Sequence, residues 1–163
     1  MAMSADGFIT NKTDGFVDWT SKEDKKHFVA VTKDAGVLIY GSKTFALHNK
    51  PLPKRLNIVL TRTPDTSKNI PDQLEFTNQE PLAILEDLAR RGFKKVALTG
   101  GAEINTLFLR AGLIDELFIT VEPFIFGAGK RLFADAHETV KMELADTSML
   151  NEQSVLLHYK VVK

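Results

Sequence analysis

The 163-residue chain contains no cysteine. Disulfide bonds, thiolate catalysis and cysteine-based zinc or iron–sulfur sites are therefore excluded. The four histidines are far apart in the sequence and form no HxH or HxxxH pair, so we expect no metal site.

An excess of charge of one sign is also lacking, because 21 lysines and arginines balance 21 aspartates and glutamates. The basic residues are scattered, which argues against binding to nucleic acid or to an anionic membrane. The longest apolar runs, VLIY and LFITV, have the length of a strand and are too short to span a membrane. The N-terminal MAMSADGFIT lacks the basic and apolar regions of a signal peptide, and we expect a soluble, cytoplasmic protein.

Short apolar runs alternate with helical patterns, and several runs are apolar at consecutive positions, as in the buried strands of an α/β sheet. The predicted strands are 37–41, 57–61, 95–99 and 116–122, and the predicted helices are about 22–34, 81–91 and 102–111. Segments 141–150 and 154–163 flank a polar turn and predict an antiparallel hairpin, whereas 63–73 is typical of a surface loop. We therefore predict one three-layer α/β domain over residues 1–163, with a mixed, mostly parallel central sheet and an antiparallel C-terminal hairpin.

The segment DWTSKEDKKHF opens the first predicted helix. It contains two overlapping capping boxes, Thr20 with Glu23 and Ser21 with Asp24, and only one of them can cap the helix. Asp24 also lies on a helix face that is otherwise apolar and that includes Phe28. A carboxylate on a buried face is costly without a partner. Asp24 is therefore either a capping residue or an acid with a functional role.

Three points at the ends of predicted strands could bind phosphate. The turns TGG (99–101) and YGSKT (40–44) each lead into a helix, where free backbone N–H groups favour anions. Arg62 follows a third strand. Because ligands of α/β sheets bind beyond the carboxyl ends of the strands, the three points suggest a dinucleotide with an additional phosphate. Three ordinary turns are the alternative.

Arg55 follows two prolines in PLPKRLNIVL and directly precedes a strand. The prolines stiffen the chain before it, and a guanidinium held in place suits bidentate binding of a carboxylate. A solvated surface arginine is the alternative.

Together these segments resemble dihydrofolate reductase over nearly the whole chain. Residues 41–61 are similar to the family segment G-R-x-T-[WF]…P-L-P-x-R-x-N-[IV]-[IV]-L-[ST]. The spacing W-x4-D-x3-F (19–28), the glycine pair after a strand (100–101) and Thr120 in ELFIT also match that family.

Three further segments resemble the reductases of riboflavin synthesis and related bacterial proteins. These are MSADGFIT, GLIDELFITVEP (112–123) and G-x-G-x-x-LF (127–133). Those reductases share the fold and the use of NADPH but reduce a phosphoribosylamino-pyrimidine. Asp24 and Arg55 stand where a pterin and its glutamyl tail would require an acid and an arginine. On this ground the sequence favours dihydrofolate reductase, a monomer or homodimer that makes tetrahydrofolate for one-carbon metabolism, and the riboflavin-pathway reductase is the alternative.

The resemblance to dihydrofolate reductase implies roles for three catalytic residues. Asp24 would orient the pterin and help water to protonate N5 while hydride from NADPH reaches C6. Thr120 would support Asp24, and Trp19 would pack over the site and hold an ordered water. With Asp24 assigned to chemistry, Glu23 is left as the capping acid.

The resemblance also implies the binding residues. Phe28 would stack on the pterin, Leu52 would line the path of the tail and Arg55 would bind the tail carboxylate. At the NADPH site, Ala2, Ile9 and Thr99 would contact the nicotinamide, and Thr61 and Arg62 would bind the 2′-phosphate. The turns that begin at Gly41 and Gly100 would lie near the pyrophosphate, with the residues Gly41, Ser42, Lys43, Thr44, Gly100, Gly101, Ala102, Glu103 and Ile104.

Three positions depart from the dihydrofolate reductase pattern. Ser42 stands where an arginine is usual, so phosphate binding would depend more on Lys43, Thr44 and Arg62. Asn105 stands in place of a tyrosine near the nicotinamide, and the first strand begins almost at the first residue of the chain.

Overall fold

The computed structural model describes residues 1–11, 18–134 and 138–163. One of its two four-stranded sheets is entirely parallel and has the order β5-β4-β3-β6. Its strands are β3 (Val37–Gly41), β4 (Leu56–Leu60), β5 (Leu74–Thr77) and β6 (Ala97–Leu98). Every residue of β3 and β4 is buried, as expected for apolar strands that are covered on both faces.

Helices cover both faces of this parallel sheet. They are α1 (Lys22–Ala35), α2 (Ser42–His48), α3 (Pro81–Arg90) and α4 (Ala102–Arg110). Because side chains alternate along a strand, Val37 and Ile39 of β3 pack in a cluster with α3 and α4, whereas Leu38 and Tyr40 pack with α1 and α2. The predicted three-layer α/β architecture is confirmed.

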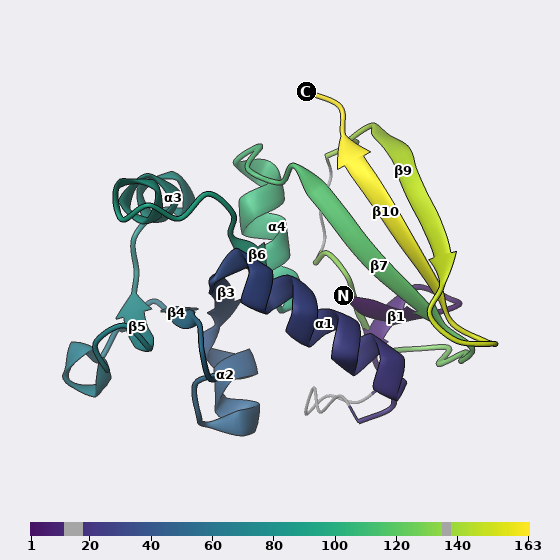
Figure 1. Cartoon of the computed structure of the whole chain (residues 1–163), viewed down its shortest axis with the longest axis horizontal. Coiled ribbons are helices and arrows are strands. Elements are labelled where there is room, and N and C mark those ends of the chain that lie inside the picture. The colour runs from purple at the N-terminus through teal and green to yellow at the C-terminus, as the bar shows by residue number, and fades with distance from the viewer. Residues whose placement is uncertain (12–17, 135–137) are drawn as a thin grey trace.

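The second four-stranded sheet has the order β1-β7-β10-β9 and lies on the right of Figure 1. Its strands are β1 (Ala2–Ser4), β7 (Glu116–Glu122), β9 (Met142–Met149) and β10 (Val155–Val161). Strand β1 is parallel to β7, and the remaining pairs are antiparallel. The predicted C-terminal hairpin is therefore β9 and β10. Strands β2 (Phe8–Thr10) and β8 (Lys130–Arg131) form a separate antiparallel pair.

The structure differs from the predicted single central sheet in one respect. Strands β1 and β6, which end the two four-stranded sheets, have three and two residues and do not pair with each other. Such short strands offer few ladder hydrogen bonds. The sequence also gave no signal for β5, a four-residue edge strand, or for a 3₁₀ turn at Thr66–Lys68 within the predicted loop.

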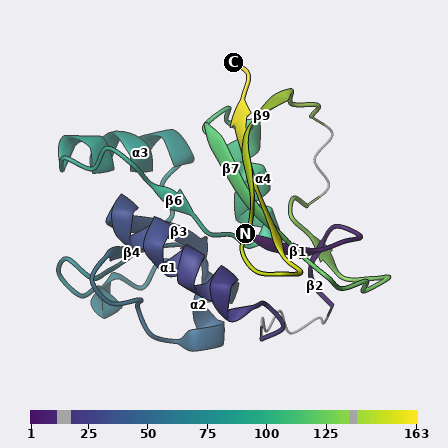
Figure 2. The ribbon, with the colours of Figure 1, turned by 45° about the vertical axis from the view of Figure 1, so that its right-hand side comes forward.

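Helix α1 lies over the junction between the two four-stranded sheets. It contacts β3 and β6 of the parallel sheet, and the ring of His27 lies 5.9 Å from that of Phe118 on β7. In both views α1 crosses in front of β3 (Figures 1 and 2). None of the helices in the described ranges has the length and apolarity needed to cross a membrane.

Candidate functional site

The first turn of α1 is fixed by Ser21 and Glu122. The hydroxyl of Ser21 accepts a hydrogen bond from the backbone N–H of Asp24 at 3.1 Å, so Ser21 is the N-cap. The N–H and hydroxyl of Ser21 both donate to Oε1 of Glu122, at 2.8 and 2.7 Å. The prediction that Thr20 and Glu23 form the cap is therefore wrong, because Glu122 from β7 supplies the carboxylate that the N-cap N–H requires. Glu23 is exposed and accepts from Asn151 at 3.2 Å.

Asp24 is 9% exposed, although it lies in the first turn of a surface helix. Since the N–H of Ser21 bonds to Glu122, the carboxylate of Asp24 has no capping duty. Thr120 is almost fully buried on β7, but its hydroxyl has no hydrogen-bond partner among the described residues, so the expected support of Asp24 is not present as a hydrogen bond. Trp19 packs edge-on against Phe126, at 4.9 Å between ring centroids, and leaves its indole N–H likewise without a partner in those residues.

Of the three predicted substrate residues, Phe28 lies on α1, and Leu52 and Arg55 lie in the loop before β4. Phe28, one turn after Asp24, packs with Leu52 against the apolar cluster on this face of the parallel sheet. Arg55 is 6% exposed, and its guanidinium donates to the hydroxyl of Thr32 and, at 3.0 Å, to the carbonyl of Pro53. Burial lowers the pKa of Arg55. The alternative of a solvated surface arginine is therefore wrong.

Asn57 organises the loop that carries Leu52 and Arg55, and the sequence analysis missed it. It is fully buried, and its Nδ2 lies 2.8–2.9 Å from the carbonyl oxygens of Leu52, Arg55 and Gln73. Its Oδ1 accepts from the N–H of Leu52 and from the hydroxyl of Tyr40, both at 2.9 Å. Burial raises the pKa of Tyr40 to about 12, so this hydroxyl stays protonated and donates at neutral pH. An asparagine inside an apolar strand was the available signal.

The predicted phosphate-binding turns meet at one edge of the parallel sheet. Strands β6, β3 and β4 are neighbours, so the turns after their carboxyl ends lie next to one another. The N–H of Gly41 donates to the carbonyl of Gly100 at 2.8 Å, and a Cβ on Gly101 would lie 3.5 Å from the hydroxyl of Thr44. Gly100 has a φ of +95°, which favours glycine. Helix α4 begins here with its first N–H groups without intrahelical partners.

The remaining predicted cofactor residues differ in their surroundings. Lys43 and Glu103 bind each other at 3.2 Å across this edge, which reduces the charge that Lys43 offers to a phosphate. Arg62 is exposed directly after β4, and no acid pairs with it within the described parts of the chain. Ala2 and Ile9 lie on β1 and β2 outside the parallel sheet, and the side chain of Met1 approaches Gly100. Asn105 is buried and donates to the carbonyl of Leu132 at 2.8 Å.

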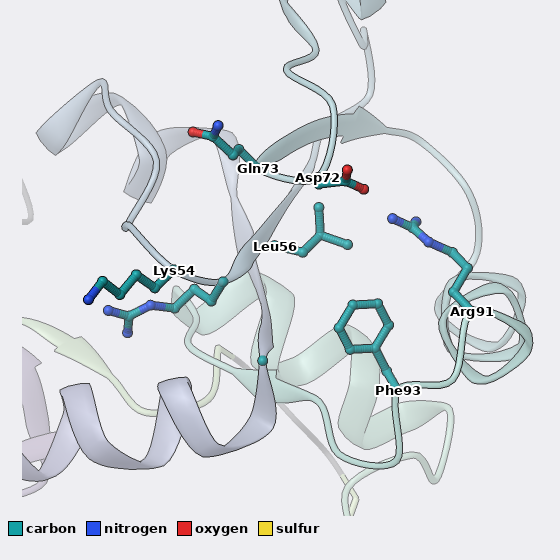
Figure 3. Close-up of a pocket in the computed structure, with 8 residues that line it drawn as sticks. Lys54, Leu56, Asp72, Gln73, Arg91 and Phe93 are labelled. Atoms are coloured by element: carbon teal, nitrogen blue, oxygen red, sulfur yellow. The ribbon is translucent and has the colours of Figure 1, made fainter.

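A hollow of about 610 Å³ lies at the opposite edge of the parallel sheet, where β3, β4 and β5 begin. In Figure 3, Lys54 lies on one side of Leu56, and Arg91 and Phe93 lie on the other. Arg55 also lines this hollow, whereas Arg91 is bound to Glu75 at 2.8 Å. The hollow is therefore far from the predicted cofactor turns and shares only Arg55 with the predicted substrate residues.

Comparison with known proteins identifies the family. The sequence profile of the RibD C-terminal domain matches residues 1–156. The uncharacterised protein YyaP of Bacillus subtilis is 28% identical over 178 residues, which cover 98% of this chain and 91% of YyaP. Dihydrofolate reductase type 9 of Escherichia coli is 32% identical over 118 residues, which cover 68% of this chain and 64% of that enzyme.

Solved structures show the same fold. A putative riboflavin biosynthesis protein from Shewanella sp. PV-4 superimposes with a TM-score of 0.84 at 23% identity, covering 100% of this chain and 97% of that one. A diaminohydroxyphosphoribosylaminopyrimidine deaminase/5-amino-6-(5-phosphoribosylamino)uracil reductase from Thermotoga maritima superimposes with a TM-score of 0.81 at 17% identity. This chain is covered over 99% of its length but spans 55% of the Thermotoga protein.

These findings correct the predicted activity. The profile match extends over nearly the whole chain, whereas the match to a dihydrofolate reductase covers about two thirds of each protein. The prediction of dihydrofolate as substrate, and of a role in tetrahydrofolate synthesis and one-carbon metabolism, is therefore wrong. Asp24 and Arg55, on which the prediction of dihydrofolate rested, therefore did not separate the two kinds of enzyme.

Proposed function

Because the chain belongs to the family of RibD C-terminal domains, we propose that it is an NADPH-dependent reductase of a pyrimidine that carries a phosphorylated sugar. The name of the Thermotoga maritima protein, which includes a 5-amino-6-(5-phosphoribosylamino)uracil reductase, supports this substrate class. In this chain, Arg55 carries the proposal that the substrate bears an anionic group, because it is a buried cation without an acidic partner in the described residues. The choice of a phosphorylated sugar over a carboxylate tail rests on the family.

Arg55 has the properties of an anion-binding residue. Its partners Thr32 and Pro53 are neutral, so they orient the guanidinium without neutralising its charge. A buried charge without a counter-ion is costly, and a bound phosphate would remove that cost. Thr32 lies eight residues after Asp24 on α1, or about 12 Å along the helix axis. A substrate with a polar ring at Asp24 and a phosphate at Arg55 therefore fits the spacing.

Asp24 would orient the ring of this substrate. An ionised carboxylate only accepts hydrogen bonds, so Asp24 would bind a ring N–H and hold the pyrimidine in one orientation. In its open-chain form the sugar is joined to the ring amine as an imine. Reduction of this imine places a hydride on carbon and a proton on nitrogen. Since Asp24 would bind the edge of the ring remote from that nitrogen, water would deliver the proton.

The residues at the carboxyl edge of β3, β4 and β6 fit NADPH. When bound, this cofactor supplies the hydride. The Gly100–Gly101 turn and the start of α4 would hold its pyrophosphate, because side chains there would fill the space next to Thr44. The exposed Arg62 would bind the 2′-phosphate.

The test is to follow the absorbance of NADPH with purified protein and one of two substrates, a 5-amino-6-(phosphoribosylamino)pyrimidine or dihydrofolate. We expect consumption only with the phosphoribosylamino compound. Consumption with dihydrofolate alone, or absence of NADPH binding in a titration of its fluorescence, would overturn the proposal.

Asp24→Asn should lower kcat/KM by roughly a hundredfold, because one of the two carboxylate acceptors becomes an N–H donor that would face the N–H of the ring. Binding of NADPH should stay within twofold of the wild-type value. The matched control is Asp18→Asn, which changes an exposed acid of the same segment that binds Lys25. Equal losses in both variants would remove Asp24 from the site.

A further inference from the structure

Three buried polar atoms around the first turns of α1 have no hydrogen-bond partner in the described part of the chain. They are Nε1 of Trp19, Nε2 of His27 and Oγ1 of Thr120. A buried polar atom that stays unpaired is destabilising, because it has lost its hydrogen bonds to water. Three such atoms around the start of the helix that carries Asp24 point to a ligand with a polar edge.

Of the three residues with an unpaired atom, His27 lies closest to Asp24 in the sequence. It follows Asp24 by three residues, a spacing that places two side chains on the same side of a helix. Its ring lies 5.9 Å from Phe118, which precedes Thr120 by two residues on β7 and therefore points to the same face of that strand. Asp24, His27 and Thr120 thus face one another across the contact between α1 and β7.

The pattern of donors and acceptors distinguishes two kinds of pyrimidine ring. An aminopyrimidine that is protonated on a ring nitrogen presents adjacent N–H donors, and a carboxylate satisfies both of them without help. A uracil edge alternates carbonyl, N–H and carbonyl, so a carboxylate that accepts from the N–H also faces a carbonyl oxygen that it repels. A donor beside the carboxylate removes this repulsion.

We infer that His27 supplies this donor: its Nε2–H binds a ring carbonyl next to Asp24 and selects a uracil-type ring over an aminopyrimidine. This inference rests on the proposed function, because it concerns the ring of the same substrate. The indole N–H of Trp19 and the hydroxyl of Thr120 are the other available donors.

The surroundings of His27 agree with a neutral donor. Burial and the positive charge of the N-terminal ammonium of Met1 lower the pKa of His27, and the negative charge of Asp24 acts in the opposite direction. A neutral imidazole that is protonated at Nε2 donates one hydrogen bond in a fixed direction. The ring of His27 lies against that of Phe118 at an interplanar angle of 51°.

The test compares two small ligands by calorimetry with protein saturated with NADP⁺. One is 5,6-diaminouracil and the other is 2,4,5,6-tetraaminopyrimidine, which has amino groups in place of both carbonyls. His27→Phe keeps an aromatic ring against Phe118 and removes the donor. It should weaken binding of diaminouracil roughly tenfold, and change that of the tetraamino compound less than twofold. His27→Gln, which restores a donor amide, should recover most of the loss.

The matched control is His158→Phe. His158 lies opposite Phe118 on the neighbouring strand β10, stacks on its ring at 4.1 Å between centroids, and binds Glu116. This variant should leave the ratio of the two affinities unchanged. Equal weakening of both ligands by His27→Phe, or no weakening of either, would overturn the role of His27. If wild-type protein binds NADP⁺ but not diaminouracil, the proposed substrate class fails, and this inference fails with it.

Discussion

At the scale of single residues, the surroundings of Arg55 and His27 matter more than their residue types. Arg55 is held by the neutral Thr32 and Pro53, so its charge remains available to a ligand. His27 is held against Phe118 with Nε2 unpaired in the described residues. The prolines before Arg55 predict a guanidinium that is held in place. The position of His27, three residues after Asp24, predicts no role, because this spacing is also common in ordinary amphipathic helices.

Arg55→Gln should raise KM for the phosphorylated substrate by about 10- to 100-fold, the range for a lost charged hydrogen bond. The affinity for an analogue without the phosphate should change less than twofold. Steady-state kinetics and calorimetry measure the two quantities. Arg90→Gln, which removes an exposed arginine of α3, is the control. If Arg55→Gln weakens the binding of both ligands equally, Arg55 stabilises the loop and does not bind the phosphate.

The pH dependence of stability should reveal the burial of His27. Burial lowers the pKa of His27 in the folded protein, so the unfolded chain binds a proton first as the pH falls below about 6.5. The free energy of unfolding should therefore decrease between pH 7 and pH 5, and His27→Phe should decrease less. Urea unfolding at several pH values measures both slopes. Identical slopes would contradict the effect of burial on His27.

At the scale of elements, the start of α1 depends on a strand that is distant in the sequence. Glu122 of β7 accepts from Ser21 and, through its other oxygen, from Ser154 at 2.5 Å. This carboxylate replaces the reciprocal half of a local capping box. Asp24 is thereby left without a capping duty, as the sequence analysis expected, but Ser21 rather than Thr20 is the cap.

Ser21→Ala should lower the free energy of unfolding by about 1–2 kcal/mol, because it removes the N-cap and one hydrogen bond to the buried Glu122. Urea denaturation gives the value. The control is Ser67→Ala, which removes an exposed hydroxyl bonded to Asp65 and should change stability by less than about 0.5 kcal/mol. A cost for Ser21→Ala no larger than that of Ser67→Ala would contradict the assigned cap.

At the scale of the whole molecule, packing between turns and α4 assembles the carboxyl edge of the parallel sheet, where we propose that NADPH binds. A Cβ on Gly41 would lie 2.9 Å from Cγ1 of Ile104, so the turn after β3 rests directly on α4. Gly41 has an ordinary negative φ of −81°, and its requirement for glycine is therefore one of space. The same edge is linked by the hydrogen bond from Gly41 to Gly100.

Gly41→Ala should lower the free energy of unfolding by about 1–3 kcal/mol, the usual cost of overpacking, and should weaken the binding of NADPH. The cost should be smaller when Ile104 is already alanine, because the crowding atom is then absent. Urea unfolding of the two single variants and the double variant completes this cycle. If the two changes in the free energy of unfolding are additive, a side chain at position 41 does not clash with Ile104.

The local features of this protein can be predicted from its sequence. Hydrophobic periodicity placed the buried strands, α1, α3, α4 and the C-terminal hairpin within a few residues of their bounds. These features follow from interactions between near neighbours along the chain. The short strands β2, β5 and β8 were missed, because so few residues carry no periodic signal.

Other features depend on tertiary contacts and could not be predicted. The division into two four-stranded sheets, the capping carboxylate of Glu122 and the loop anchored by Asn57 all depend on contacts between residues distant in sequence. The burial of Arg55 and the unpaired Nε2 of His27 are likewise consequences of packing. Sequence motifs indicated an acid and an arginine. What such a pair can bind is set by the donors and acceptors beside it, which the fold brings together.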